Sequence, residues 1–308
     1  MNDKKRLLIT GVSGLLGNNL AWYFRDLYEV FGTYLEHPVN ISGVMTRRCD
    51  VTVQADAEKL IKEYRPHVLI HCVALTNLDR CEEDVAQCDR LNHGSIKNLV
   101  EAARGIEKEL KLVYISTDGV YDGQKGNFSE SDPIAPQNHY GTTKYAGELE
   151  ALKIKGALIL RTNFFGWNIQ DKDSLGEWVI KSLAAGKTID GFTDAIFSSL
   201  YTLDLAHIID LALKRDLAGV YNCGAHNSVS KFVFAQELAK VFGFDGSLIR
   251  PRSILDYPFK AKRGVNLSMN VGKLEQALGI TMSTVEESIR RFYEDYQKGL
   301  PAAIKKHE

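Results

Sequence analysis

Glycines at positions 11, 14 and 17 follow a short apolar run and precede a stretch whose apolar residues recur at helical spacing. This order predicts a strand, a tight turn and a helix in immediate succession. Gly11 would permit the turn, Gly14 would let a phosphate approach the backbone, and Gly17 would let the helix pack on the strand. Because free N–H groups at a helix start attract anions, we expect a phosphate-binding turn. Its G-x-x-G-x-x-G spacing differs from the simplest dinucleotide-binding motif, so a glycine-rich loop without a ligand is the alternative.

Strand-length and helix-length segments alternate through the first half of the chain. Strands are predicted at residues 28–34, 67–73, 110–116 and 157–161, and helices at residues 15–27, 55–64, 84–104 and 140–155. Strands joined by helices of this length need parallel crossover connections. The pattern therefore predicts an α/β fold built on a doubly wound parallel sheet of the Rossmann type.

The second half of the chain is less regular and indicates a smaller lobe. Helices are predicted at residues 174–185, 202–214, 230–243, 271–278 and 284–298, with a strand at 219–223 that returns to the main sheet. Ser230 is the expected N-cap and Gly243 the expected C-terminal glycine of one helix. Since 308 residues exceed what one core usually holds, we expect two parts. A dinucleotide-binding domain would comprise residues 1–162 and about 198–226, and a discontinuous substrate-binding lobe about 163–197 and 227–308.

The composition excludes several other classes of protein. Hydrophobic residues make up 44% of the chain and charged residues 25%, and the net charge of -1 gives no support for a nucleic-acid or membrane partner. No apolar stretch is long enough for a membrane span, and only a strand-length apolar run follows the basic N-terminus, so no signal peptide is expected. The five cysteines match no zinc-binding spacing. We expect reduced thiols in a cytoplasmic protein, and no metal site is predicted.

Tyr140 and Lys144 are the candidate catalytic pair. They lie four residues apart in a predicted helix, and therefore on one face, in reach of a common ligand. A free tyrosine titrates near pH ~10, and we expect a neighbouring ammonium to lower the pKa of the phenol, so that Tyr140 can act as an acid or base. Lys144 would also bind the nicotinamide ribose. Exposed Y-x-x-x-K pairs without a role are common, so the evidence for a catalytic role comes from the position of this pair in the chain.

Ser116, Thr117 and Asp118 close the preceding predicted strand, and a loop rich in glycine, serine, aspartate and proline follows over residues 119–137. Ligands of open α/β sheets bind at the carboxyl ends of strands, where such loops leave the sheet. Hydroxyl groups at this strand end can bind the same carbonyl oxygen as Tyr140. The glycine turn, the strand-end hydroxyl and the Y-x-x-x-K pair, in this order, predict one site for a dinucleotide and a carbonyl substrate.

The end of the second predicted strand would meet the adenosine ribose. There an acid binds a free 2′-hydroxyl, and a basic residue accepts a 2′-phosphate. Glu36 stands near that place and favours NAD, whereas Arg47 and Arg48 would suit NADP. The alternative, that these three side chains are solvated surface groups without a role in binding, has equal support. The predicted cofactor is therefore NADP or NAD.

Several motifs together resemble the extended short-chain dehydrogenase/reductases, and within them the dTDP-4-dehydrorhamnose reductase family. They are the glycine turn, Asp50-Val51, Ser116-Thr117-Asp118, Tyr140-Gly141-Thr142-Thr143-Lys144 with Ala146-Gly147-Glu148, and Arg161-Thr162. The resemblance continues through Ser230-Lys231-Phe232 and Asn270 to Gly279, nearly to the C-terminus. It implies an enzyme that uses NAD(P)H to reduce the 4-keto group of a nucleotide-linked 6-deoxysugar, and it allows a homodimer.

The resemblance also assigns residue roles. Thr117 would polarise the carbonyl, Tyr140 would protonate its oxygen, and Lys144 would tune Tyr140 and hold the ribose. Asp118, Asn163 and Phe164 would join Thr117 at the substrate. The cofactor would lie along Gly11, Ser13, Gly14, Leu15, Leu16, Gly17, Glu36, Asp50, Val51, Cys72, Val73, Ala74, Thr76, Tyr140 and Lys144.

Some residues depart from the family patterns. Sugar-nucleotide dehydratases of this superfamily typically carry Thr-Asp-Glu, so the Thr117-Asp118-Gly119 of this chain disfavours dehydration. The reductases more typically show Ser-Thr-Asp-Tyr-Val-Phe, and Gly119 and Tyr121 therefore leave the sugar open. Residues 191–195 do not reproduce the Gly-Ala-Pro-Thr expected near the nucleotide. Two alternatives stay open: a sugar-nucleotide 4-epimerase, and a regulatory subunit like the β subunit of methionine adenosyltransferase.

Overall fold

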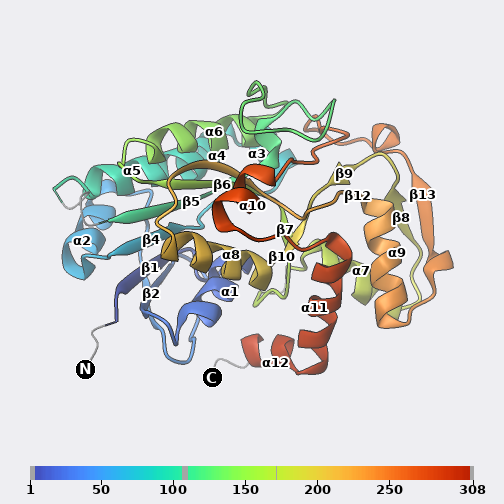
Figure 1. The fold of residues 1–308 in the computed structure, drawn as a ribbon, viewed down its shortest axis with the longest axis horizontal. Helices are drawn as coiled ribbons and strands as arrows, with labels where there is room; N and C mark the ends of the chain where they lie inside the picture. The colour runs from blue at the N-terminus through green and yellow to red at the C-terminus, as the bar shows by residue number, and fades with distance from the viewer. Residues whose placement is uncertain (1–3, 106–109, 171, 306–308) are drawn as a thin grey trace.

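A seven-stranded parallel sheet forms the centre of the protein (Figure 1). The structure is a computed structural model that describes residues 4–105, 110–170 and 172–305. The strands lie in the order β11-β6-β5-β4-β1-β2-β3. Their bounds are β1 Arg6–Thr10, β2 Glu29–Tyr34, β3 Met45–Arg48, β4 Val68–His71, β5 Lys111–Thr117, β6 Leu158–Thr162 and β11 Gly219–Cys223. The predicted doubly wound sheet is confirmed, including the return strand β11, which pairs in parallel with β6.

Helices cover both faces of this sheet, as its largely apolar strands require. Helices α1 (Leu15–Phe24) and α8 (Thr202–Lys214) pack on one face, and α2 (Gln54–Tyr64), α5 (Ser95–Ala102) and α6 (His139–Ala151) pack on the other (Figure 1). Successive strand residues alternate between the two cores, so that Leu7 joins the core beneath α1 and Leu8 joins the core beneath α2. Helix α1 ends before the predicted boundary at residue 27.

The second half of the chain adds small sheets and further helices. The pairs are β7 (Phe164–Phe165) with β10 (Leu200–Tyr201), β8 (Ile189–Phe192) with β13 (Ile249–Arg252), and β9 (Ile196–Phe197) with β12 (Val229–Ser230). The helices are α7 (Leu175–Ala184), α9 (Lys231–Phe242), α10 (Gly272–Leu278), α11 (Val285–Gln297) and α12 (Leu300–Lys305). Both predicted caps of α9 are confirmed, since the Ser230 side chain accepts a hydrogen bond from the N–H of Val233 and Gly243 has a left-handed φ of 74°.

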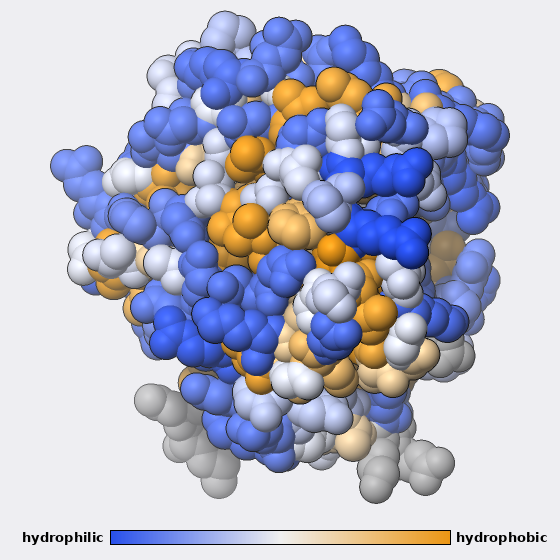
Figure 2. All heavy atoms as spheres, turned by 90° about the vertical axis from the view of Figure 1, so that its right-hand side faces the viewer, coloured by the Kyte–Doolittle hydropathy of each residue, from blue (hydrophilic) through white to orange (hydrophobic). Residues whose placement is uncertain are grey.

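Apolar and hydrophilic residues are mixed on the side of the molecule where α9 and β13 lie (Figure 2). No helix in the described ranges is both long and apolar enough to cross a membrane.

The segment predicted as one helix over residues 84–104 is interrupted. Asp84 caps α4 (Val85–Asp89) with its side chain, as the predicted start requires, but a π-helical turn occupies Arg90–Gly94 before α5 begins. A further helix, α3 (Leu78–Glu83), precedes Asp84 and was not predicted. The π-turn has a structural reason, because it aims the Asn92 side chain at the loop after β4. There Asn92 accepts a hydrogen bond from the N–H of Leu75 at 2.7 Å and donates one to the Leu75 carbonyl at 3.2 Å.

Candidate active site

A cavity of about 750 Å³ opens at the carboxyl ends of the strands, where the strand order reverses between β1 and β4. At such a point the loops after two neighbouring strands diverge and leave a crevice for a ligand. Every predicted site residue except Lys144 lines this cavity: Gly11, Ser13, Gly14, Leu15, Leu16, Gly17, Glu36, Asp50, Val51, Cys72, Val73, Ala74, Thr76, Thr117, Asp118, Tyr140, Asn163 and Phe164. Residues spread over most of the chain are therefore brought together.

The glycine turn has the geometry that its spacing predicts. Gly11 has a φ of 79°, a conformation that other residues rarely adopt, and its N–H donates to the Thr33 carbonyl at 2.8 Å. A Cβ at Gly17 would lie 2.2 Å from the Gly11 carbonyl oxygen, so only glycine lets α1 approach β1 this closely. A Cβ at Gly14 would be 3.4 Å from that oxygen, which is an ordinary contact. The protein itself thus tolerates a side chain at Gly14 but not at Gly17.

The start of α1 fits the phosphates of a dinucleotide. Its N-cap is Gly14, which has no side chain to bond the first N–H groups of the helix. Leu15 and Leu16 in this first turn line the cavity. Uncapped N–H groups at a helix start bind anions through their hydrogens and through the helix dipole. The cradle therefore matches the group that the sequence predicts there.

The end of β2 and the residues after it also border the cavity. Glu36 and the adjacent His37, which was not predicted, line the cavity. Arg47 donates a hydrogen bond to Glu63 at 2.8 Å, and Arg48 donates one to the Leu35 carbonyl at 3.2 Å. Neither arginine is among the lining residues. Both guanidinium groups have partners on the surface, which leaves an acid at the predicted ribose position.

Thr117 and Tyr140 come together where α6 meets the end of β5. The side chain of Asn138 caps α6 by accepting a hydrogen bond from the N–H of Gly141 at 2.9 Å. A Cβ at Gly141 would lie 2.2 Å from the Gly119 carbonyl oxygen, so this glycine lets the helix start against the turn after β5. A Cβ at Gly119 would be 3.4 Å from Thr117 Oγ1 and 3.9 Å from Tyr140 Cδ1. The hydroxyl and the phenol therefore border the same point of the cavity wall.

Lys144 lies one helical turn beyond Tyr140, and its side chain is almost wholly buried and is not among the residues that line the cavity. Its ammonium is over the face of Tyr114, 4.2 Å from the ring centroid. Burial lowers the pKa of Lys144 to about 8, and the Glu148 carboxylate on the same helix opposes this change. The pKa of Lys144 is therefore much closer to neutrality than that of a free lysine.

The predicted lowering of the pKa of Tyr140 is wrong for the chain alone. Burial of the phenol raises its pKa, the Thr117 hydroxyl opposes the rise, and the Asp118 carboxylate adds to it. The physical reason is desolvation, which penalises the phenolate more than the surrounding groups of the chain stabilise it. Tyr140 is accordingly a protonated phenol at neutral pH, and in the chain alone it is a weaker acid than a free tyrosine.

Polar groups gather beside Thr117 on the substrate side. Asp118 accepts hydrogen bonds from Thr117 at 3.0 Å and from Asn163 at 3.1 Å, and burial raises the pKa of Asp118 to about 6. Lys231 and Arg263, which were not predicted as site residues, line the same region. Burial lowers the pKa of Lys231, with Arg263 adding to the effect. Two cations from the second half of the chain thus face the cavity.

The spacing of residues along the chain gave little indication that Lys231 and Arg263 line the cavity. Lys231 follows the N-cap of α9, and its position could have been read from the Ser230-Lys231-Phe232 motif. Arg263 lies outside any helix or strand and reaches the cavity because its guanidinium donates to Asp79 at 3.2 Å and stacks on Phe259. In the described part of the chain, no set of three acidic, histidine or cysteine side chains forms a candidate metal site.

A glycine turn at the switch point of a doubly wound sheet, with a threonine at a strand end and a Y-x-x-x-K helix beside it, defines the extended short-chain dehydrogenase/reductases. Within this class the chain belongs to the family described as RmlD substrate binding domain, whose sequence profile matches residues 5–298.

Individual relatives agree with this placement. The chain is 29% identical over 301 residues to the dTDP-4-dehydrorhamnose reductase of Aggregatibacter actinomycetemcomitans, with 92% of this chain and 97% of that protein covered. It is also 29% identical over 309 residues to methionine adenosyltransferase 2 subunit beta of Rattus norvegicus, with 94% and 89% covered. A crystal structure of dTDP-4-dehydrorhamnose reductase from Bacillus anthracis in complex with NADP matches the fold with a TM-score of 0.84 at 26% identity, covering 95% of this chain and 99% of that one.

Proposed function

We propose that the protein is an NAD(P)H-dependent reductase of the 4-keto group of a nucleotide-linked 6-deoxysugar, similar to dTDP-4-dehydrorhamnose reductase. The observation that carries this proposal is one cavity that is lined both by the start of α1, which has no side-chain cap, and by the adjoining Thr117 and Tyr140. The names of the relatives support the substrate class. A bound dinucleotide supplies the hydride.

The residues of the chain supply orientation and a proton. The Thr117 hydroxyl, which donates its single proton to Asp118 in the chain alone, turns this proton to the substrate carbonyl oxygen and draws electron density from the carbonyl carbon. Tyr140 gives its phenolic proton to the same oxygen as the alcohol forms. The Lys144 ammonium, one helical turn away on α6, then stabilises the phenolate electrostatically. Asp118 and Asn163, joined by a hydrogen bond, hold sugar hydroxyl groups.

The two further cations suit the nucleotide part of this substrate. The Nε atom of Arg263 is buried without a hydrogen-bond partner among the described residues, although its side chain lines the cavity. A diphosphate brings two negative charges and several acceptor oxygens, which would satisfy a guanidinium and an ammonium together. We therefore infer that Arg263 and Lys231 bind the diphosphate.

The decisive experiment compares the wild-type protein with Tyr140→Phe. Purified protein is mixed with a dTDP-4-keto-6-deoxysugar and NADH or NADPH, and oxidation of the dinucleotide is followed by its absorbance. The wild type should turn over, and the variant should be at least about a hundredfold slower with unchanged dinucleotide affinity, because only the proton donor is lost. Equal rates in the two proteins would remove Tyr140 from the reaction.

A regulatory subunit is the second candidate, and the 29% identity to methionine adenosyltransferase 2 subunit beta favours it. Such a protein would bind the dinucleotide without turnover and would bind a methionine adenosyltransferase. Dinucleotide binding without oxidation in the presence of keto-sugar nucleotides, together with co-elution with that enzyme on size-exclusion chromatography, would favour this candidate over the reductase.

Three coarser properties go with the proposal. We infer a division between residues 1–162 with about 198–226 and the rest, which the small sheets outside the main sheet support. A cytoplasmic location is in keeping with the free cysteines of the chain. A homodimer is a prediction that the mass in solution tests.

A further inference from the structure

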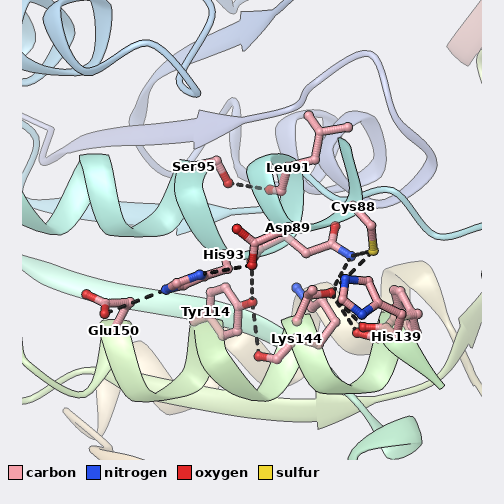
Figure 3. Close-up of polar contacts among 12 residues, drawn as sticks. Cys88, Asp89, Leu91, His93, Ser95, Tyr114, His139, Lys144 and Glu150 are labelled. Carbon is pink, nitrogen blue, oxygen red and sulfur yellow. Dashed lines mark hydrogen bonds and ion pairs between the residues drawn. The ribbon is translucent and has the colours of Figure 1, made fainter. Parts of the chain in front are cut away.

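The buried ammonium of Lys144 has an aromatic ring as its neighbour rather than a hydrogen-bond acceptor. It lies over Tyr114 of β5 at 4.2 Å from the ring centroid, and Figure 3 shows the two side chains together between α6 and the preceding helical segment. None of the described residues accepts a hydrogen bond from its Nζ atom, whereas the buried guanidinium of Arg161 is bonded to Glu148 and Tyr121. The chain thus treats these two buried cations in different ways.

Tyr114 is held firmly in the position that its role needs. Its hydroxyl faces the carbonyl oxygens of Asn92, at 3.2 Å, and of Lys144, at 3.3 Å, and so ties β5 to the π-turn and to α6 (Figure 3). The ring also stacks on His71, with centroids 6.0 Å apart and 14° between the planes. A Cβ at Gly147 would lie 2.1 Å from the Tyr114 hydroxyl oxygen. Only glycine there lets α6 come this close to the ring.

We propose that Tyr114 is a positioning residue for Lys144, holding the ammonium by the face of its ring while leaving the N–H donors of the ammonium free. An aromatic face attracts a cation through its quadrupole and accepts few of its hydrogen bonds. A carboxylate at this place would neutralise the ammonium and occupy its donors. The free donors are what a ribose and a phenolate need, so this inference rests on the role of Lys144 in the proposed function.

The titratable groups around Lys144 are paired with other residues or uncharged, so the Tyr114 ring is the main group that holds the ammonium. On α6 they are Tyr140, one turn earlier, and Glu148, which is paired with Arg161. On β4 and the loop after it they are His71 and Cys72, and on α4 the thiol Cys88. Burial lowers the pKa of His71 to about 3 and raises that of Cys72 to about 12, so both are neutral across the working pH range.

The test replaces Tyr114 by phenylalanine and then by phenylalanines carrying an increasing number of ring fluorines. Tyr114→Phe keeps the ring face and loses only the hydroxyl, and fluorination weakens the face at nearly constant shape. The titration of Lys144 is followed by NMR of lysines labelled with ¹³C at Cε in the ligand-free protein, and the pH profile of kcat/KM is measured in parallel. Loss of the ring face disfavours the ammonium, so both the titration and the alkaline limb should move to lower pH, by about one unit across the series.

Tyr221 offers a matched control, because Lys273 lies over its ring at 4.5 Å far along the chain from Lys144. The same fluorinated residues at Tyr221 should leave the Lys144 titration unchanged. Identical titrations of Lys144 throughout the Tyr114 series would overturn the inference while reductase activity could still be present. A shift of that titration in a protein without reductase activity would support the position of the ammonium and overturn the proposed function instead.

Discussion

Substituting Gly17 by alanine should separate the packing of the glycine turn from its contact with a ligand. The added Cβ would lie 2.2 Å from the Gly11 carbonyl oxygen, 2.8 Å from the Gly11 carbonyl carbon and 3.0 Å from the Val12 Cα. All three atoms are backbone, so α1 must move away from β1. Overpacking of this kind costs about 3 kcal/mol at the upper end of its usual range, and the better helix propensity of alanine returns about 1 kcal/mol. We expect a net loss of about 2 kcal/mol.

Gly14→Ala is the matched control. Its Cβ would make an ordinary 3.4 Å contact, so the free energy of unfolding should fall by less than about 1 kcal/mol, the cost of replacing glycine by alanine at an N-cap. Gly14 lines the cavity at the start of α1, so the added methyl group would compete with a bound pyrophosphate for space. Dinucleotide affinity should therefore fall by about tenfold or more, which needs a penalty of only about 1.4 kcal/mol.

Urea unfolding followed by tryptophan fluorescence and circular dichroism measures the first quantity, and calorimetric titration with NADH and NADPH measures the second. Gly17→Ala should lower the midpoint of unfolding more than Gly14→Ala does. A Gly17→Ala protein as stable as the wild type would refute the packing argument. Unchanged dinucleotide affinity in Gly14→Ala would refute the assignment of the turn as a phosphate cradle.

Three further predictions concern charged groups. Glu36→Gln should raise the affinity for NADPH relative to NADH by about fivefold, since a carboxylate near the ribose repels a 2′-phosphate. Arg47→Ala should leave the ratio of the two affinities unchanged, because Arg47 is paired with Glu63. The reverse pattern in calorimetric titrations would assign phosphate recognition to Arg47. Arg161→Met should lower the free energy of unfolding by about 3 to 5 kcal/mol, because it leaves the buried Glu148 carboxylate without its bidentate partner. The double variant with Glu148→Gln should recover part of this loss. Equal losses in the single and double variants would contradict the prediction. Burial raises the pKa of Asp118 to about 6, so the folded chain binds a proton that the unfolded chain has released, and the free energy of unfolding should decline as pH rises from about 4 to about 6. Asp118→Asn should remove that decline, and an equal decline in the variant would assign it to other groups.

Local patterns predicted the strands and helices whose residues interact mainly within their own element. The glycine turn, the caps of α9 and the full extent of α8 follow from turn chemistry and helical periodicity. By contrast β3 has the sequence Met-Thr-Arg-Arg and is largely exposed, so no apolar alternation marks this edge strand. The π-turn was missed because its residues continue an amphipathic helix, and only the bonds between Asn92 and Leu75 explain the shift of register.

The site residues also divide into those set by local sequence and those set by contacts between distant residues. Those that stand at strand ends or in motifs, such as Thr117, Tyr140 and Glu36, could be predicted and lie at the cavity. Arg263 could not, because it reaches the cavity through its pairing with Asp79, a residue far away in sequence. The direction of the pKa of Tyr140 also depended on burial, which spacing along a helix does not report.

The position of β11 has a consequence for synthesis of the chain on the ribosome. This strand covers the outer edge of β6, and it is separated from β6 by roughly sixty residues, so the edge stays open for about 3 to 12 s at ordinary elongation rates. During that interval the amide and carbonyl groups along Leu158–Thr162 are an exposed template to which a second nascent chain can add. Neighbouring chains on one polysome can therefore pair through this edge after β6 has emerged and before β11 has followed it.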